Sequence, residues 1–153
     1  MAQDATATTR HPIVGTWLAQ VTLNEGDARP ALLVYGADGS VLAPQPPSMP
    51  GFPGMTSIIY VSPAAGVWEA LDENAASVTF ALLVSDGTGA VLGHFSFNSH
   101  LEVAADGLTY EQTYTATFTD PTGMALPMGV GAATAQRIVV EPMVLPEGAT
   151  PAT

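Results

Sequence analysis

The sequence has no cysteine, no lysine and few charged residues of any kind. The absence of cysteine excludes disulfides, thiol chemistry and cysteine-ligated metal sites, and it leaves the redox compartment open. Three basic residues, all arginine, stand against 14 acidic ones in a chain of 153, which gives a formal net charge of −11. The chain therefore lacks the basic surface that neutralises phosphate groups, and we expect no nucleic acid among its partners.

Long hydrophobic runs are also absent. No apolar run approaches the roughly 20 residues that cross a bilayer, so we expect no membrane span. Residues 1–10 lack the apolar segment of a signal peptide, and their Ala and Thr content suits either a cytoplasmic terminus or the mature end of an exported protein. We predict a flexible segment over 1–12, one domain over 13–141 and a flexible tail over 142–153.

Catalytic and metal-binding motifs are missing as well. The chain contains no His-Glu-x-x-His, no Gly-x-Ser-x-Gly and no phosphate loop ending in Gly-Lys-Ser/Thr. His94, His100 and Glu102 are side chains of metal-ligand type on one predicted strand. The two histidines are six residues apart, which is about 20 Å along an extended chain. We therefore predict no metal site and no cofactor.

The sequence does contain many turn signals between β-rich runs. Asp-Gly occurs at 38–39, 86–87 and 106–107, and Asp-Pro-Thr-Gly at 120–123. Asp-Gly between such runs favours a hairpin, because both residues tolerate a positive φ. The pattern predicts about eight to ten strands and no helix, as in a sandwich or barrel. The predicted strands are 13–23, 30–35, 40–43, 56–61, 66–71, 77–85, 90–103, 108–119 and 132–141, with a weaker one at 124–128.

The run 108–119 alternates almost strictly between large side chains and threonines. Successive residues of a strand point to opposite faces, so the threonines are predicted to face solvent and the other set to face the interior. In the run 90–103, Phe95 and Phe97 are predicted to point inward and the two histidines outward. These assignments depend on register, because a slip of one residue exchanges the two faces. The inward set of 108–119 is Leu108, Tyr110, Gln112, Tyr114, Ala116 and Phe118.

Gly15-Thr16-Trp17 opens the first predicted strand, and Arg137 lies in the last. This arrangement resembles the calycin superfamily. The resemblance implies an all-β, single antiparallel up-and-down barrel of about eight strands, in which Trp17 closes one end and Arg137 lies over it. Lacking cysteine and any evident helix after the barrel, the chain looks nearer to bacterial lipocalin-like proteins or allene-oxide-cyclase-type barrels. The alternative is an outward Arg137, since most arginines lie at the surface.

Residues 44–55 interrupt the strand pattern. Five Pro and two Gly in this stretch predict a long, stiff loop that does not pair in a sheet. Met49, Phe52 and Met55 give it an apolar surface, which suits an adaptable lid over the mouth of a barrel. The alternative is that the loop packs against the outside of the barrel.

Three function classes fit these observations, and we expect a monomer or homodimer in each. The first is binding of a small apolar ligand within the barrel. The second is a cyclase or isomerase acting on a flexible unsaturated molecule in the same cavity, with Tyr110, Tyr114 or an inward Glu69 as the proton-handling group. An exposed Glu69 is the alternative for that carboxylate. The third is a structural or interaction module with a filled core. The predicted ligand-binding residues are Phe80, Phe95, Phe97, Tyr110, Gln112, Tyr114 and Phe118, together with Met49, Phe52 and Met55.

Overall fold

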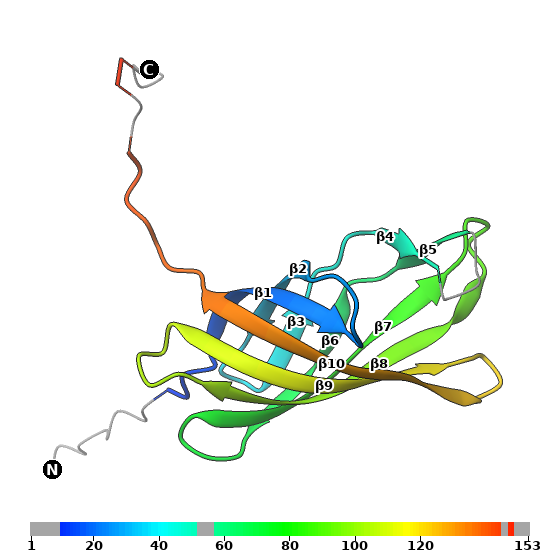
Figure 1. The fold of residues 1–153 in the computed structure, drawn as a ribbon, viewed down its shortest axis with the longest axis horizontal. Helices are drawn as coiled ribbons and strands as arrows, with labels where there is room; N and C mark the ends of the chain where they lie inside the picture. The colour runs from blue at the N-terminus through cyan, green and yellow to red at the C-terminus, as the bar shows by residue number, and fades with distance from the viewer. Residues whose placement is uncertain (1–9, 52–56, 145–146, 149–153) are drawn as a thin grey trace, which may run out of the picture.

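The computed structural model describes residues 10–51, 57–144 and 147–148. Within these residues the chain forms ten strands and no helix. Eight strands close into an antiparallel ring in the order β1, β2, β3, β6, β7, β8, β9, β10 (Figure 1). The predicted all-β, up-and-down barrel is therefore confirmed. The strands are β1 (Gly15–Leu23), β2 (Arg29–Tyr35), β3 (Ser40–Ala43), β4 (Ser48–Pro50), β5 (Ile58–Val61), β6 (Ala64–Ala70), β7 (Ala75–Ser85), β8 (Val91–Val103), β9 (Thr109–Thr119) and β10 (Ala125–Arg137).

Strand β9 alternates as its sequence predicts. Its threonines at 109, 113 and 115 are exposed, whereas Tyr110, Gln112, Tyr114 and Ala116 are buried. Leu108 precedes the strand and is 50% exposed, so its predicted inward position is wrong. Strands β8 and β10 flank β9 over most of its length, so β9 is part of the barrel wall. Its alternating side chains therefore point either into the barrel or to solvent.

The proline-rich stretch departs from its prediction, because Ser48–Pro50 forms strand β4. Met49 is paired with Ile59 of β5, and β5 in turn pairs with β7 beside the ring. Strand β4 lies at the outer edge of the sheet order, where a proline without an N–H group removes no ladder hydrogen bond. The expectation that this stretch does not pair is therefore wrong for 48–50, while β4 and β5 remain outside the ring.

The last strand also differs from its prediction. The weak segment and the final segment form the single strand β10, which has a bulge between Pro127 and Gly129 and ends at Arg137. Its partner β9 begins at Thr109, which pairs with Gln136, so β9 offers no strand for residues 138–141 to pair with. The β-branched composition of 138–140 did not extend the strand, and Val140 is almost fully exposed.

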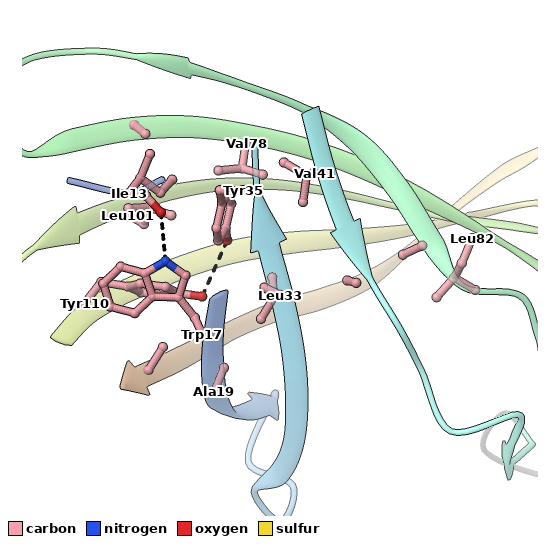
Figure 2. Packing of buried hydrophobic residues seen from close by; sticks show 14 of the residues in the cluster. Ile13, Trp17, Ala19, Leu33, Tyr35, Val41, Val78, Leu82, Leu101 and Tyr110 are labelled. Atoms are coloured by element: carbon pink, nitrogen blue, oxygen red, sulfur yellow. Dashed lines mark hydrogen bonds between the residues drawn. The ribbon is translucent and has the colours of Figure 1, made fainter. Parts of the chain in front are cut away.

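One end of the barrel is filled by large side chains. Trp17 is completely buried, and its indole N–H donates a 2.7 Å hydrogen bond to the carbonyl of Ile13. The ring of Tyr110 lies 4.8 Å from that of Trp17, and Tyr35 meets Tyr110 edge-on (Figure 2). Leu101 packs into the same cluster with no exposed surface. This end of the barrel is called the closed end below.

Arg137 lies over Trp17 at the closed end. Its guanidinium carbon is 4.3 Å from the centroid of the indole, which is cation–π geometry. Nε donates to the Gly107 carbonyl at 2.7 Å and Nη1 to the Val14 carbonyl at 2.8 Å, while Nη2 donates to the carbonyl of Pro12. Burial, and to a lesser degree the charge of Arg10, lowers the pKa of Arg137. The guanidinium still remains charged, as arginine does throughout the range of protein function.

The residues before β1 pack across the closed end. The His11 ring lies 5.3 Å from that of Trp68, and its Nε2 is 3.0 Å from the Asp72 carbonyl. Pro12 accepts a hydrogen bond from Arg137. These two residues are the last of the predicted segment 1–12, whose residues 1–9 lie outside the described part of the chain.

Gly15 makes the contact between Trp17 and Arg137 sterically possible. Its φ is +142°, and an added Cβ would lie 2.5 Å from Nη1 of Arg137. Gly89 also has a positive φ, +86°, but an added Cβ there would meet nothing within 4 Å. Alanine at either position must adopt a positive φ, but only at position 15 would its Cβ also meet the guanidinium.

We predict that Gly15→Ala destabilises the protein by at least about 2 kcal/mol more than Gly89→Ala, which should cost about 1 kcal/mol through backbone strain alone. Urea unfolding of the two variants and the native sequence measures the difference. Equal losses for the two variants would mean that the close approach of Arg137 to Gly15 contributes nothing.

Candidate functional site

The barrel is hollow at the end away from Trp17. A cavity of about 370 Å³ is lined by residues from seven of the eight ring strands and from the β4–β5 hairpin. Its apolar wall includes Val21, Ala31, Leu33, Ala43, Met49, Ile59, Phe80, Leu82, Phe95, Phe97, Ala116, Met128 and Ala133. Four of these side chains are alanines, which are too small to fill the space between facing strands. The cavity therefore results from small residues at inward positions, next to an end that large residues fill.

Three neighbouring strands contribute an aromatic wall. Phe80 of β7 and Phe97 of β8 are cross-strand partners whose rings stack at 4.9 Å. Phe97 also meets Phe95 at 6.0 Å and Tyr114 of β9 at 5.9 Å. These centroid distances are those of favourable aromatic pairs, so the rings hold one another in place along the cavity.

Tyr114 crosses the barrel wall from β9 to β1. Its hydroxyl donates a 2.6 Å hydrogen bond to the Thr22 carbonyl, passing over Gly131 of the intervening strand β10. A Cβ at Gly131 would lie 2.1 Å from Cζ of the tyrosine. The absence of a side chain at Gly131 therefore leaves room for the ring of Tyr114. Burial raises the pKa of Tyr114 to about 12.

Gln112 and Ser99 form a buried polar pair at the inner end of the cavity. Nε2 of Gln112 donates to Ser99 Oγ at 2.7 Å, and Ser99 donates to the Val78 carbonyl at 3.3 Å. Gln112 lines the cavity although only 7% of its surface is exposed. Along the inner face of β9 it stands between Tyr110 of the closed end and Tyr114 of the cavity wall. Sequence reasoning found Gln112 but missed Ser99, since a serine in a strand carries no signal of its partner.

The mouth of the cavity lies between the β1–β2 turn and the residue that follows β4. The β1–β2 turn contributes Gly26 and Asp27, and the first residue of β2 contributes Arg29. Asn24 of this turn, at φ +54°, donates to the carbonyl of Met128 at 3.2 Å, which ties the turn to the β10 bulge. Gly51, which follows β4, also lines the cavity.

The predicted lid is placed only in part. Met49 lines the cavity, as does Pro50. Phe52 and Met55 lie outside the described residues.

Two predicted ligand-binding residues do not line the cavity. Tyr110 belongs to the closed end, where its hydroxyl is 3.4 Å from that of Tyr35, and burial raises its pKa to about 12. Phe118 packs on Phe95 at 5.4 Å and covers Gly93, whose added Cβ would lie 2.7 Å from the Phe118 ring. Alternation places both residues inward, but it does not say at which height along the barrel the space is filled.

Glu69 lies on the outside of the barrel. It is exposed, as are Val67 and Leu71 on the same face. Trp68 decides which face of β6 is inward. It is half-buried, and its indole N–H donates to the Gly36 carbonyl at 2.8 Å. An inward Glu69 is therefore wrong, and the exposed alternative describes it.

Charged groups are sparse around the site. The described part of the chain has one ion pair. It is exposed, and it joins His100 Nε2 to Glu102 Oε1 at 3.5 Å. The same residues contain no cluster of three His, Asp or Glu side chains that would hold a metal ion. They also include no helix with the length and apolar character needed to cross a membrane.

Comparison with known proteins adds no family assignment. No protein-family model matches the chain, and no curated protein matches it significantly.

The buried tyrosines predict how stability depends on alkaline pH. Tyr110 ionises in the unfolded chain near pH 10 but in the folded protein only near pH 12. Between these values the native state binds more protons than the unfolded state, so stability falls as pH rises. We predict that Tyr110→Phe makes this decline shallower by up to about 1 kcal/mol per pH unit, as measured by urea unfolding from pH 9 to 11.5. An unchanged slope in the variant would contradict the assignment of Tyr110 to a buried, protonated state.

Proposed function

We propose that the protein binds a small, largely apolar molecule in the barrel cavity, as a calycin-like barrel. The observation that supports this proposal is the cavity itself, about 370 Å³ and lined mainly by apolar and aromatic side chains. That volume falls within the roughly 300–1,000 Å³ typical of ligand pockets. Interiors are usually packed without voids of this size, so a hollow of this kind in a small domain favours an occupant.

The dimensions of the cavity restrict the ligand. An engineered cavity of about 150 Å³ takes one benzene molecule, and this cavity of about 370 Å³ is more than twice as large. A molecule with two or three fused rings, or an acyclic molecule of similar size, is therefore the expected class. The aromatic wall of Phe80, Phe97 and Tyr114 offers ring faces and edges to such a ligand.

Binding is better supported than turnover by the positions of the three candidate catalytic groups. Glu69 is outside the barrel, and Tyr110 belongs to the closed end. Tyr114 does line the cavity, but its hydroxyl proton is donated to the Thr22 carbonyl and its pKa is raised to about 12. A general acid or base works best with a pKa near the operating pH. The cavity also argues against a module with a filled core.

A fluorescent apolar probe tests this proposal. We expect 1-aminoanthracene to bind with a Kd on the order of micromolar, which corresponds to about −0.5 kcal/mol for each of its roughly 15 non-hydrogen atoms. Ala116→Leu places a larger side chain in the cavity wall and should weaken binding at least about tenfold. The matched control is Thr115→Leu, on the exposed face of the same strand, which should leave the affinity unchanged.

The measurement is fluorescence enhancement on titration of the probe, with thermal unfolding of each variant as a check of folding. Equal affinity of the two variants would place the probe on the outer surface and contradict binding in the cavity. Absence of binding to the native protein by this probe and by smaller arenes would contradict the proposal itself.

A further inference from the structure

Gln112 is the buried polar side chain that the cavity presents at its inner end. The other polar groups of the lining lie elsewhere: Asp27 and Arg29 are exposed at the mouth, and Gln45 donates to the Ala43 carbonyl. The hydroxyl of Tyr114 donates its proton to the barrel wall. A ligand that fills the cavity must therefore meet the amide of Gln112, and it must do so away from water.

The orientation of that amide is set by its neighbour. Ser99 donates its proton to the Val78 carbonyl, so its oxygen can only accept from Gln112, and the amide nitrogen must face Ser99. The amide oxygen Oε1 then points the other way. In the described part of the chain, Oε1 accepts no hydrogen bond. Every fully enclosed side-chain oxygen in that part does have a hydrogen-bond partner. Oε1 therefore keeps an accessible surface, and the cavity that Gln112 lines provides it.

We propose that Gln112 Oε1 accepts a hydrogen bond from the ligand, which is consequently a ring-sized molecule with an uncharged hydroxyl or N–H group at its inner end. This inference rests on the proposed function and specifies the ligand class. The donor group meets Gln112, and the apolar body lies along Phe80 and Phe97 toward the mouth.

The placement of the three arginines argues against an anionic group at the inner end of the ligand. Arg137 is occupied at the closed end, Arg10 is exposed, and Arg29 stands at the mouth. No cation of the chain is thus at the inner end, where a carboxylate would face the negative end of the Gln112 amide dipole. The net charge of −11 further disfavours an anionic ligand.

The expected discrimination follows from the cost of an unpaired buried acceptor. An apolar ligand expels the water that solvates Oε1 and replaces it with nothing, whereas a hydroxyl takes the place of that water. A methyl ether of the same skeleton brings only an acceptor oxygen. The native protein should therefore prefer 2-naphthol to 2-methoxynaphthalene by about tenfold or more.

The experiment measures displacement of 1-aminoanthracene by naphthalene, 2-naphthol and 2-methoxynaphthalene. Gln112→Met keeps the length of the side chain but removes the amide, and it should abolish the preference for the hydroxyl while naphthalene still binds. Ser99→Ala leaves Gln112 in place but frees its amide to turn, and it should reduce the preference. Thr113→Val, on the exposed face of β9 next to Gln112, is the control, and it should keep the preference.

The outcomes are distinguishable. If naphthalene and 1-aminoanthracene both fail to bind the native protein, the proposed function fails and this inference with it. If naphthalene binds but 2-naphthol binds no better than its methyl ether, the cavity is a binding site and the role of Gln112 is overturned. A preference that survives in Gln112→Met, or that disappears in Thr113→Val, overturns it as well.

Discussion

The barrel depends on the contact between Trp17 of the first ring strand and Arg137 of the last. The two residues are direct partners in the β1–β10 ladder, and the guanidinium lies on the indole. Because the planar group also donates to three carbonyls, it joins the residues before β1 and the β8–β9 turn to the same point. A single charged side chain thereby ties the first and last ring strands together at one end and holds the segment that covers that end.

The filled end makes the hollow end possible. Trp17, Tyr35, Tyr110 and their aliphatic neighbours bury enough apolar surface to hold the strands together, which allows alanines at the inward positions of the other end. Tyr114 adds a brace across that end, since it joins β9 to β1 over Gly131. The cavity therefore does not result from loose packing, and its rigid wall is what would make the orientation of Gln112 selective.

Sequence reasoning was most successful where alternation and turn chemistry were strong, as in β9 and its flanking turns. It failed where two inward residues differ only in their height along the barrel. Tyr110 and Tyr114 have the same parity, yet one fills the core and the other lines the cavity. It left the orientation of Glu69 open between inward and exposed, because only the packing of Trp68 decides which face of β6 is inward.

The sequence by itself determined that the chain forms antiparallel strands, since Asp-Gly turns and period-two alternation are local properties. It also placed Trp17 in the first strand of the pattern and Arg137 in the last. Only the tertiary structure decided which inward side chains meet, where the barrel is hollow, and that Ser99 orients Gln112. Those are contacts between residues distant in sequence, and their geometry follows from how far each strand is shifted against its neighbours around the ring.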